Sequence, residues 1–231
     1  MAKKTKKRKV IIFDLDGTLY ALRGGSYAKS PLRKCVLQNT EKFIAVRLST
    51  SASNARSILR GIQKKYGEQI SIGLEKEFSI NRYDYFNTVW DIPANGIVKK
   101  SPRLTEMLNA LRKQYRFALV SDAPRVWIRN VLKELGIQSF FSGRIFSGEG
   151  NRRKGLGTAF REVARILKTN TRNCIVVGDQ ERTDMVPAKK LGMHTIFIHR
   201  TRHSPVADFR IRHIRELSSV IAKFSKKETL K

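Results

Sequence analysis

Four carboxylic acids stand at or just beyond the ends of apolar runs in this sequence. Asp14 and Asp16 follow the run VIIF, Asp179 follows CIVVG, and Asp184 comes five positions later. Because side chains alternate along an extended chain, Asp14 and Asp16 point to the same side, and Gly17 permits a tight turn that leaves both carboxylates free. Carboxylates this close raise each other's pKa unless a cation neutralises them. Mg²⁺ prefers such ligands and commonly bridges to phosphate, so the spacing predicts a magnesium site beside a phosphate substrate.

The elements that must position these acids are short, branched apolar runs. They occupy residues 10–16, 117–122 and 174–179, and each ends in a polar or acidic cluster. Continuous apolar runs of this length are typical of strands buried on both faces of a parallel sheet. Helical stripes lie between the last two runs, and HTIFI at 194–198 and an amphipathic stretch near 214–224 follow. The alternation predicts an α/β fold, a Rossmann-like doubly wound parallel sheet whose strand ends collect ligands.

A long interval separates the first apolar run from the next. Residues 20–98 carry mostly helical periodicity, and a crossover helix needs far fewer residues. We therefore predict a helical cap domain inserted at 20–98. The core domain is predicted to combine residues 1–19 and 99–231, in which 1–9 form a basic tail.

The order of the motifs resembles the haloacid dehalogenase-like (HAD) hydrolase superfamily. DLDGTLY at 14–20 comes first, then a strand that ends in Ser121, then Lys154 ahead of a helix, then GDQERTD at 178–184. The resemblance extends from Val10 to about Ile198 and implies a Rossmann-like hydrolase core. The first motif, together with a helical cap between the first two motifs, is similar to the pyrimidine 5'-nucleotidase-like branch.

The resemblance implies a role for each acid. Asp14 would be the nucleophile that forms an aspartyl-phosphate, and Asp16 the acid that protonates the leaving alcohol and then the base that activates water. Asp179 would ligate Mg²⁺ together with Asp14 and the backbone carbonyl of Asp16. Asp184 would hold the metal's water shell or orient Lys154. Asp16 favours phosphoryl transfer over dehalogenation, because a dehalogenase has no leaving alkoxide to protonate.

The resemblance also implies a phosphate cradle. Ser121 would hydrogen-bond a phosphoryl oxygen, helped by backbone N–H groups around Asp122 and Ala123. Lys154 would offset the charge between phosphate and nucleophile. The family usually places proline after this lysine, whereas this chain has glycine, so Arg153 is an alternative for the cationic role.

These motifs predict a magnesium-dependent phosphatase that hydrolyses a small phosphate monoester, such as a nucleoside monophosphate. Aromatic rings in the cap segment would either stack on a base or pack in the cap's own core: Tyr20, Tyr83, Tyr85, Phe86 and Trp90. The alternative substrate is a sugar phosphate or phosphoglycolate. An inactive member of the superfamily is a further alternative.

The net charge is strongly positive. Lys and Arg number 47 against 19 Asp and Glu, which gives +28. Such a surface attracts polyanions, so a non-catalytic nucleic-acid-binding protein on the same fold is the alternative of another class. The excess is spread along the chain and no zinc finger, RNP pattern or clear helix-turn-helix is present, which favours a small phosphorylated metabolite as the partner. Removal of terminal phosphates from nucleic acid ranks lower, because a cap hinders long substrates.

The sequence also carries signals about compartment. No apolar run approaches the roughly 18 residues of a membrane span, so we expect no membrane partner. Cys35 and Cys174 lie far apart and predict neither a disulfide framework nor a zinc site, which fits a reducing compartment. We expect a cytoplasmic protein, in which the basic residues at 3–9 are either a solvated tail or a nuclear localisation signal.

Overall fold

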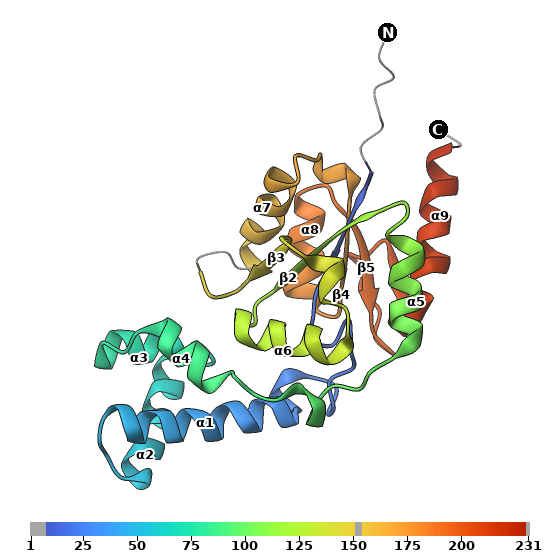
Figure 1. Ribbon diagram of the computed structural model, residues 1–231. Coiled ribbons are helices and arrows are strands. Elements are labelled where there is room, and N and C mark those ends of the chain that lie inside the picture. Colours follow the sequence, from blue (N-terminus) through green and yellow to red (C-terminus); the bar gives the residue numbers. More distant parts are fainter. Residues whose placement is uncertain (1–7, 151–153, 230–231) are drawn as a thin grey trace.

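The apolar runs form the strands of one parallel sheet in the computed structural model, which describes residues 8–150 and 154–229. The strand order is β3-β2-β1-β4-β5-β6, and each neighbouring pair is parallel. The strands are β1 (Val10–Phe13), β2 (Arg116–Ser121), β3 (Ile145–Ser147), β4 (Cys174–Gly178), β5 (His194–Ile198) and β6 (Phe209–Ile211). Helices lie on both faces of this sheet (Figure 1), which confirms the predicted doubly wound α/β class.

The two faces of the sheet are covered by different helices. On β1, Ile11 and Phe13 belong to one apolar core, whereas Val10 and Ile12 belong to the other. The first core is covered by α5 (Pro102–Leu111), α6 (Arg125–Leu135) and α9 (Leu217–Thr229), and the second by α7 (Thr158–Ile166) and α8 (Val186–Lys190). The chain changes face between β3 and β4, so the sheet has its topological switch point between β1 and β4.

Aromatic packing fixes the centre of the first core. The Phe13 ring meets the Phe117 ring edge-on, with centroids 5.3 Å apart, and the Phe141 ring with centroids 5.9 Å apart. Trp127 on α6 is fully buried in the same core. Because interiors are close-packed, the loops that leave β1 and β2 start from a rigid base.

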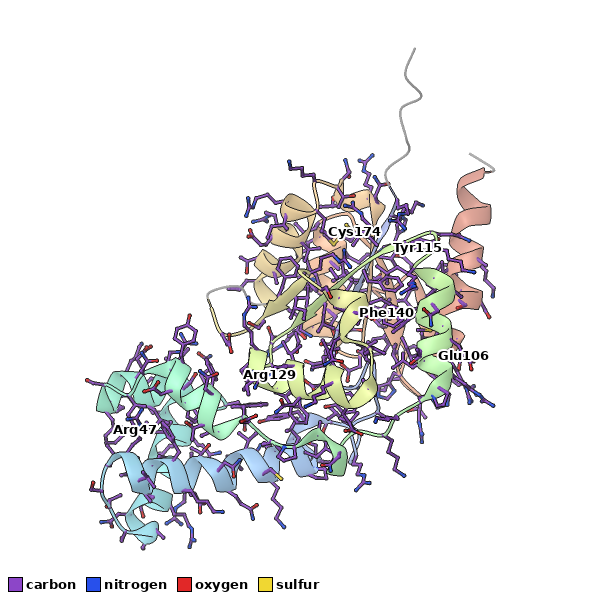
Figure 2. The ribbon with its side chains drawn as sticks, in the orientation of Figure 1. Arg47, Glu106, Tyr115, Arg129, Phe140 and Cys174 are labelled. Atoms are coloured by element: carbon purple, nitrogen blue, oxygen red, sulfur yellow. The ribbon has the colours of Figure 1, made fainter. Side chains whose placement is uncertain are left out.

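The segment 20–98 folds into helices that lie together beside the sheet (Figure 1). They are α1 (Pro31–Arg47), α2 (Ala52–Tyr66), α3 (Ile70–Phe78) and α4 (Arg82–Val89). Ser30 and Ser51 cap α1 and α2 by accepting hydrogen bonds from backbone N–H groups three residues later, and Gly67, with positive φ, follows α2. Figure 2 shows Arg47 at the end of α1 that lies away from the sheet. The division into cap and core domains at 20 and 98 stays a prediction.

The connector that returns from α4 is fastened to α6. Asn130 Nδ2 donates hydrogen bonds to Asp91 Oδ1 at 2.9 Å and to the Ile92 carbonyl at 3.1 Å. Arg129, which Figure 2 shows on α6, lies 3.9 Å from the Asp91 carboxylate. Because α6 begins shortly after β2, these contacts hold the helical segment in place beside that strand's end.

Three elements were not predicted from the sequence, namely β3, β6 and α5. The two strands have three residues each, which is too short for a periodicity to show. Residues 181–190 form a π-helical turn, Glu181–Met185, that continues directly into α8. Such turns widen a helix locally and are frequent at functional sites.

The helices are short and largely amphipathic. The longest in the described ranges, α1, has 17 residues and includes several charged side chains. No helix in the described parts of the chain is long and apolar enough to cross a membrane.

We expect Phe117→Ala to lower the free energy of unfolding by about 3–5 kcal/mol, because the change removes a buried ring that packs against Phe13, Phe140 and Phe141. Chemical denaturation followed by circular dichroism measures this loss. Val46→Ala, at a position on α1 that is 78% exposed, is the control and should change the same free energy by less than about 1 kcal/mol. Equal effects of the two changes would contradict the packing described above.

Candidate active site

Asp14 stands one residue beyond β1, in the centre of the sheet. Its backbone N–H donates to the Val177 carbonyl at 2.9 Å, which continues the ladder past the last residue of the strand. Its side chain is buried, and each carboxylate oxygen accepts one hydrogen bond: Oδ1 from Lys154 Nζ at 2.7 Å and Oδ2 from Thr18 Oγ1 at 2.8 Å. The carboxylate is thus held in one orientation where it lines a cavity.

Asp16 lines the same cavity two residues later, as the alternation of side chains predicted. Its Oδ1 accepts hydrogen bonds from the Tyr20 hydroxyl and from Trp127 Nε1, the latter at 2.9 Å. Burial raises the pKa of the Asp16 carboxyl to about 6, although the bonds from Trp127 and Tyr20 lower it. A carboxyl group with a pKa this close to neutrality is able to exchange a proton with a leaving group.

Lys154 is almost fully buried and joins two of the acids. Its Nζ lies 2.7 Å from Asp14 Oδ1 and 2.8 Å from Asp184 Oδ1, and its backbone N–H donates to Asp122 Oδ1 at 3.2 Å. Burial alone would lower the pKa of Lys154, but the carboxylates of Asp14 and Asp184 raise it well above its usual value. The amine is therefore a permanent cation. Arg153, the alternative for this role, lies outside the described residues.

An acidic cluster lies where the loops after β1 and β4 meet. Carboxylate oxygens of Asp14, Asp179 and Asp184 lie within 4.8 Å of one another. Burial raises the pKa of both Asp179 and Asp184, and the charge of Asp14 raises these values further. Asp179 Oδ1 is buried and has no hydrogen-bond partner among the residues that the structure describes. Buried polar atoms are normally paired, so this cluster of hard oxygen ligands fits a divalent cation such as Mg²⁺.

Two glycines let the acids come this close. A Cβ atom on Gly17, whose φ is +85°, would lie 2.2 Å from Asp179 Oδ2, and one on Gly178 would lie 2.4 Å from Asp184 Oδ2. Real Cβ atoms do not approach oxygen atoms so closely, and positive φ favours glycine in any case. The two glycines are therefore needed to form the acidic cluster.

The loop after β2 brings the predicted phosphate-binding residues to the cavity. Ser121 ends β2 and is buried, and its Oγ accepts a hydrogen bond from the Ala123 N–H at 3.1 Å, which leaves the Ser121 hydroxyl hydrogen able to donate. Asp122 and Ala123 line the cavity together with Ser121. A Cβ atom on Gly148 would lie 2.2 Å from the Asp122 carbonyl, so the loop after β3 packs directly against this loop.

The cavity has a volume of about 410 Å³ and lies between the strand ends and the helices of 20–98. Of the predicted aromatic residues, Tyr85, Phe86 and Trp90 line it. Tyr20 does not line it, because its hydroxyl is used on Asp16 and its ring is buried. Tyr83 is 56% exposed and lies outside the lining, because helical geometry turns it to the face of α4 opposite Tyr85.

Other residues at the site were not identified from the sequence. Trp127 contacts Asp16 across 111 positions, and Tyr27 stacks on Trp90 with ring centroids 6.0 Å apart. Arg82, at the first position of α4, also lines the cavity. These contacts join distant parts of the chain, so no local sequence pattern predicts them. Thr18 could have been identified from the sequence, because it lies inside the DLDGTLY motif.

The fold and the site together define a doubly wound α/β enzyme with its acids gathered at the switch point of the sheet. A family model described as haloacid dehalogenase-like hydrolase matches residues 8–192 of this chain. The chain belongs to this hydrolase family, as the order of its motifs predicted. The closer likeness to the pyrimidine 5'-nucleotidase-like branch stays a prediction.

Several relatives of the chain are named as phosphatases. The chain is 26% identical to human N-acylneuraminate-9-phosphatase over 121 residues, which are 50% of this chain and 49% of that protein. It is 25% identical to the glyceraldehyde 3-phosphate phosphatase of Pyrococcus abyssi over 206 residues, which are 82% of this chain and 80% of that protein. The chain thus spans about half the length of the N-acylneuraminate-9-phosphatases that it matches.

Solved structures share the fold. The chain is similar to a HAD phosphatase from Thermococcus onnurineus with a TM-score of 0.65 and 22% identity, over 92% of this chain and 97% of that one. It is also similar to a 2-haloacid dehalogenase from Pseudomonas syringae with a TM-score of 0.62 and 17% identity, over 94% and 99%. Because the same fold occurs in proteins named for different reactions, the reaction must be inferred from the site.

We expect the metal-free protein to lose stability relative to Asp179→Asn as the pH rises above about 4, the ordinary pKa of an aspartate. The folded-state pKa values of Asp179 and Asp184 are raised, so the folded chain binds more protons than the unfolded chain and its free energy of unfolding falls with rising pH. The asparagine of the variant would have the shape of the aspartate without its titration.

The test is thermal unfolding of both proteins in a chelator, from this pH up to the raised pKa of Asp179 at about 8, repeated with Mg²⁺. Added Mg²⁺ should restore the stability of the native chain at neutral pH and leave Asp179→Asn nearly unchanged. A free-energy difference between the two proteins that is constant with pH would contradict the described clustering of the acids.

Proposed function

We propose that this protein is a magnesium-dependent phosphatase that hydrolyses a small phosphate monoester through an aspartyl-phosphate. The observation that carries the proposal is the pair of carboxylates in one cavity, Asp14 fixed by Lys154 and Thr18, and Asp16 with a raised pKa. One acid is fixed in an ion pair with Lys154, and the pKa of its neighbour is raised towards neutrality. Two carboxyl groups whose environments differ in this way suit two separate roles in one reaction.

The first half of the reaction forms a bond between Asp14 and phosphorus. A carboxylate oxygen of Asp14 attacks the phosphorus atom, the bond from phosphorus to the ester oxygen breaks, and that oxygen leaves with the proton of Asp16. In the second half Asp16 takes a proton from water, whose oxygen attacks the same phosphorus. The bond between phosphorus and the Asp14 oxygen breaks, so inorganic phosphate leaves and the Asp14 carboxylate is regenerated.

The residues around the acids would stabilise the transferred group. The Ser121 hydroxyl, oriented by the Ala123 N–H, would donate to a phosphoryl oxygen, with the backbone at Asp122 beside it. Lys154 would offset the negative charge that gathers when phosphate approaches Asp14. These donors are fixed before substrate arrives, because the loops that carry them are packed, and preorganised donors of this kind are effective in catalysis.

Mg²⁺ fits the acidic cluster, in which Asp14, Asp179 and the backbone carbonyl of Asp16 would hold it. When bound, the ion neutralises phosphate oxygens and reduces the repulsion between substrate and carboxylates. The ion pair between Asp184 and Lys154 supports the second of the two roles considered for Asp184, that of orienting the lysine.

The cavity supports a small substrate. Its volume of about 410 Å³ lies near the lower end of the range for small-molecule sites. The two relatives are named for phosphate esters of small metabolites, a sugar acid and a triose. Trp90 already stacks on Tyr27, and the Tyr85 hydroxyl lies 3.2 Å from Thr40 Oγ1, so two predicted base-stacking rings are engaged within the protein. We therefore favour a sugar phosphate or another short metabolite over a nucleoside monophosphate.

We expect Asp14→Asn to reduce magnesium-dependent phosphate release at least ~10³-fold with the fold retained, because the change removes the nucleophile. The measurement is phosphate release from a panel of sugar phosphates, phosphoglycolate, triose phosphates and nucleoside monophosphates, with and without a chelator. Asp84→Asn, a matched change on the surface of α4, should keep the native rate within about twofold. In the native protein, acid quenching during turnover should trap a phosphoryl group on the peptide that contains Asp14.

The rival explanation for the charge of +28 is a nucleic-acid-binding protein without catalysis. It would be favoured if no substrate in the panel released phosphate while RNA or DNA bound in a salt-dependent manner that survived Asp14→Asn.

A further inference from the structure

Arg82 places a guanidinium group in the wall of the cavity. It is the first residue of α4, where Asn81 caps the helix through hydrogen bonds from the next backbone N–H groups. The guanidinium carbon lies 5.7 Å from the centroid of the Phe86 ring, one helical turn later. Nη2 reaches the Glu149 carbonyl at 3.5 Å, at the outer limit of a hydrogen bond. Arg82 therefore extends from the helical segment towards the loop after β3.

The guanidinium of Arg82 has a hydrogen-bond donor that the described part of the chain does not satisfy. Its Nε is buried and has no hydrogen-bond partner among the residues that the structure describes. A buried, unsatisfied donor costs free energy, and more so when it belongs to a charged group. Because Arg82 lines the cavity, its guanidinium keeps donor capacity that a ligand group could use.

Two other charged residues of the cavity wall, Lys154 and Glu68, have ion-pair partners. Lys154 is paired with Asp14 and Asp184, and Glu68 is paired with Arg33, whose Nη2 lies 2.8 Å from its carboxylate. Within the described parts of the chain, Arg82 has no carboxylate within ion-pair distance. Among the described residues, Arg82 is therefore a positive charge without an ion-pair partner on the side of the 20–98 helices, across the cavity from the acids and Lys154 at the strand ends.

We propose that Arg82 binds a second anionic group of the substrate, so that the protein selects short phosphate monoesters that also carry a carboxylate or a further phosphate. The inference rests on the proposed phosphatase function and names its substrate class. A guanidinium presents parallel N–H donors that match the two oxygens of a carboxylate or phosphate, and it is always charged. The Phe86 ring, 5.7 Å away, supports the guanidinium through a cation–π contact.

The position of Arg82 also explains why such a group would matter for turnover. The transferred phosphate would lie at Asp14 and Ser121 on the core, and the second anion would lie at α4 on the helical segment. A substrate with both groups would bridge the two sides and draw them together. A monoester with one anionic group would leave the Arg82 guanidinium without an anionic partner, which lowers its affinity.

The test uses substrate pairs that differ in the second group. Comparison of phosphoglycolate with ethyl phosphate tests recognition of a carboxylate. Comparison of fructose bisphosphate with fructose monophosphate tests recognition of a second phosphate. In at least one pair the native protein should prefer the doubly anionic member by about tenfold or more in kcat/KM. Arg82→Gln should remove that preference by raising KM for the anionic member about 10–100-fold, with the singly anionic member changed less than about threefold.

Two further variants test whether the effect requires the guanidinium and its position in the cavity. Arg82→Lys keeps the charge without the planar fork and should recover part of the preference. Arg103→Gln, at an exposed position on α5, removes an arginine outside the cavity lining and should leave both members of each pair unchanged. Absence of any preference in the native protein, or equal losses for both members in Arg82→Gln, would overturn the inference.

A binding measurement separates this inference from the phosphatase function. Phosphonoacetate and ethylphosphonate differ by the carboxylate and are not hydrolysed, so calorimetry on the native protein, Asp14→Asn and Arg82→Gln reports recognition alone. Phosphonoacetate should bind the first two proteins at least ~10-fold more tightly than Arg82→Gln. If the native protein hydrolyses no substrate but these affinity differences are observed, the proposed function is refuted and the anion site is not. Equal affinity of phosphonoacetate for all three proteins would refute binding of a carboxylate at Arg82. A bisphosphonate and a phosphonate of the same length with one anionic group test binding of a second phosphate by the same measurement.

Discussion

The ammonium group of Lys154 lies between the carboxylates of Asp14 and Asp184, at 2.7 and 2.8 Å, and the arrangement of the whole site depends on this buried ion pair. Three acids converge on this point and one lysine cannot balance them. Removing a partner from a buried ion pair costs about 3–5 kcal/mol, because the remaining charge has no water to solvate it. The residual negative charge gives the site its affinity for a divalent cation, and the unpartnered Asp179 Oδ1 shows where that charge is least compensated among the described residues.

The sheet topology explains why such an unfavourable cluster forms at all. β1 lies between β2 and β4, so Asp14 and Asp179 leave adjacent parallel strands at the same edge, on either side of the switch point. Gly17 and Gly178 remove the side-chain atoms that would keep the loops apart. The aromatic rings packed around Phe13 then supply stabilisation that offsets the repulsion between these carboxylates.

The helical segment adds selectivity to this machinery. Its side chains close a cavity of about 410 Å³ over the acids, and the connector at Asp91 is fastened to α6. Both the catalytic proposal and the anion-binding proposal follow from charge balance. Lys154 is matched by the acids at the strand ends, whereas Arg82 faces the cavity without an acid of its own among the described residues. A substrate with negative charge at both ends would satisfy the two sides at once.

The sequence by itself determined the central strands of the sheet, the family and the acids, because buried strands and their terminal loops leave strong local patterns. Asp14, Asp16, Asp179 and Asp184 follow apolar runs whose parallel pairing brings them to one edge. The rotation of α4 was decided by tertiary packing, and it turned Tyr83 to solvent and Arg82 into the cavity. The contact of Trp127 with Asp16 likewise required α6 to dock on β1. Such contacts depend on how elements far apart in the chain are oriented against each other, and no local spacing of residues encodes that orientation.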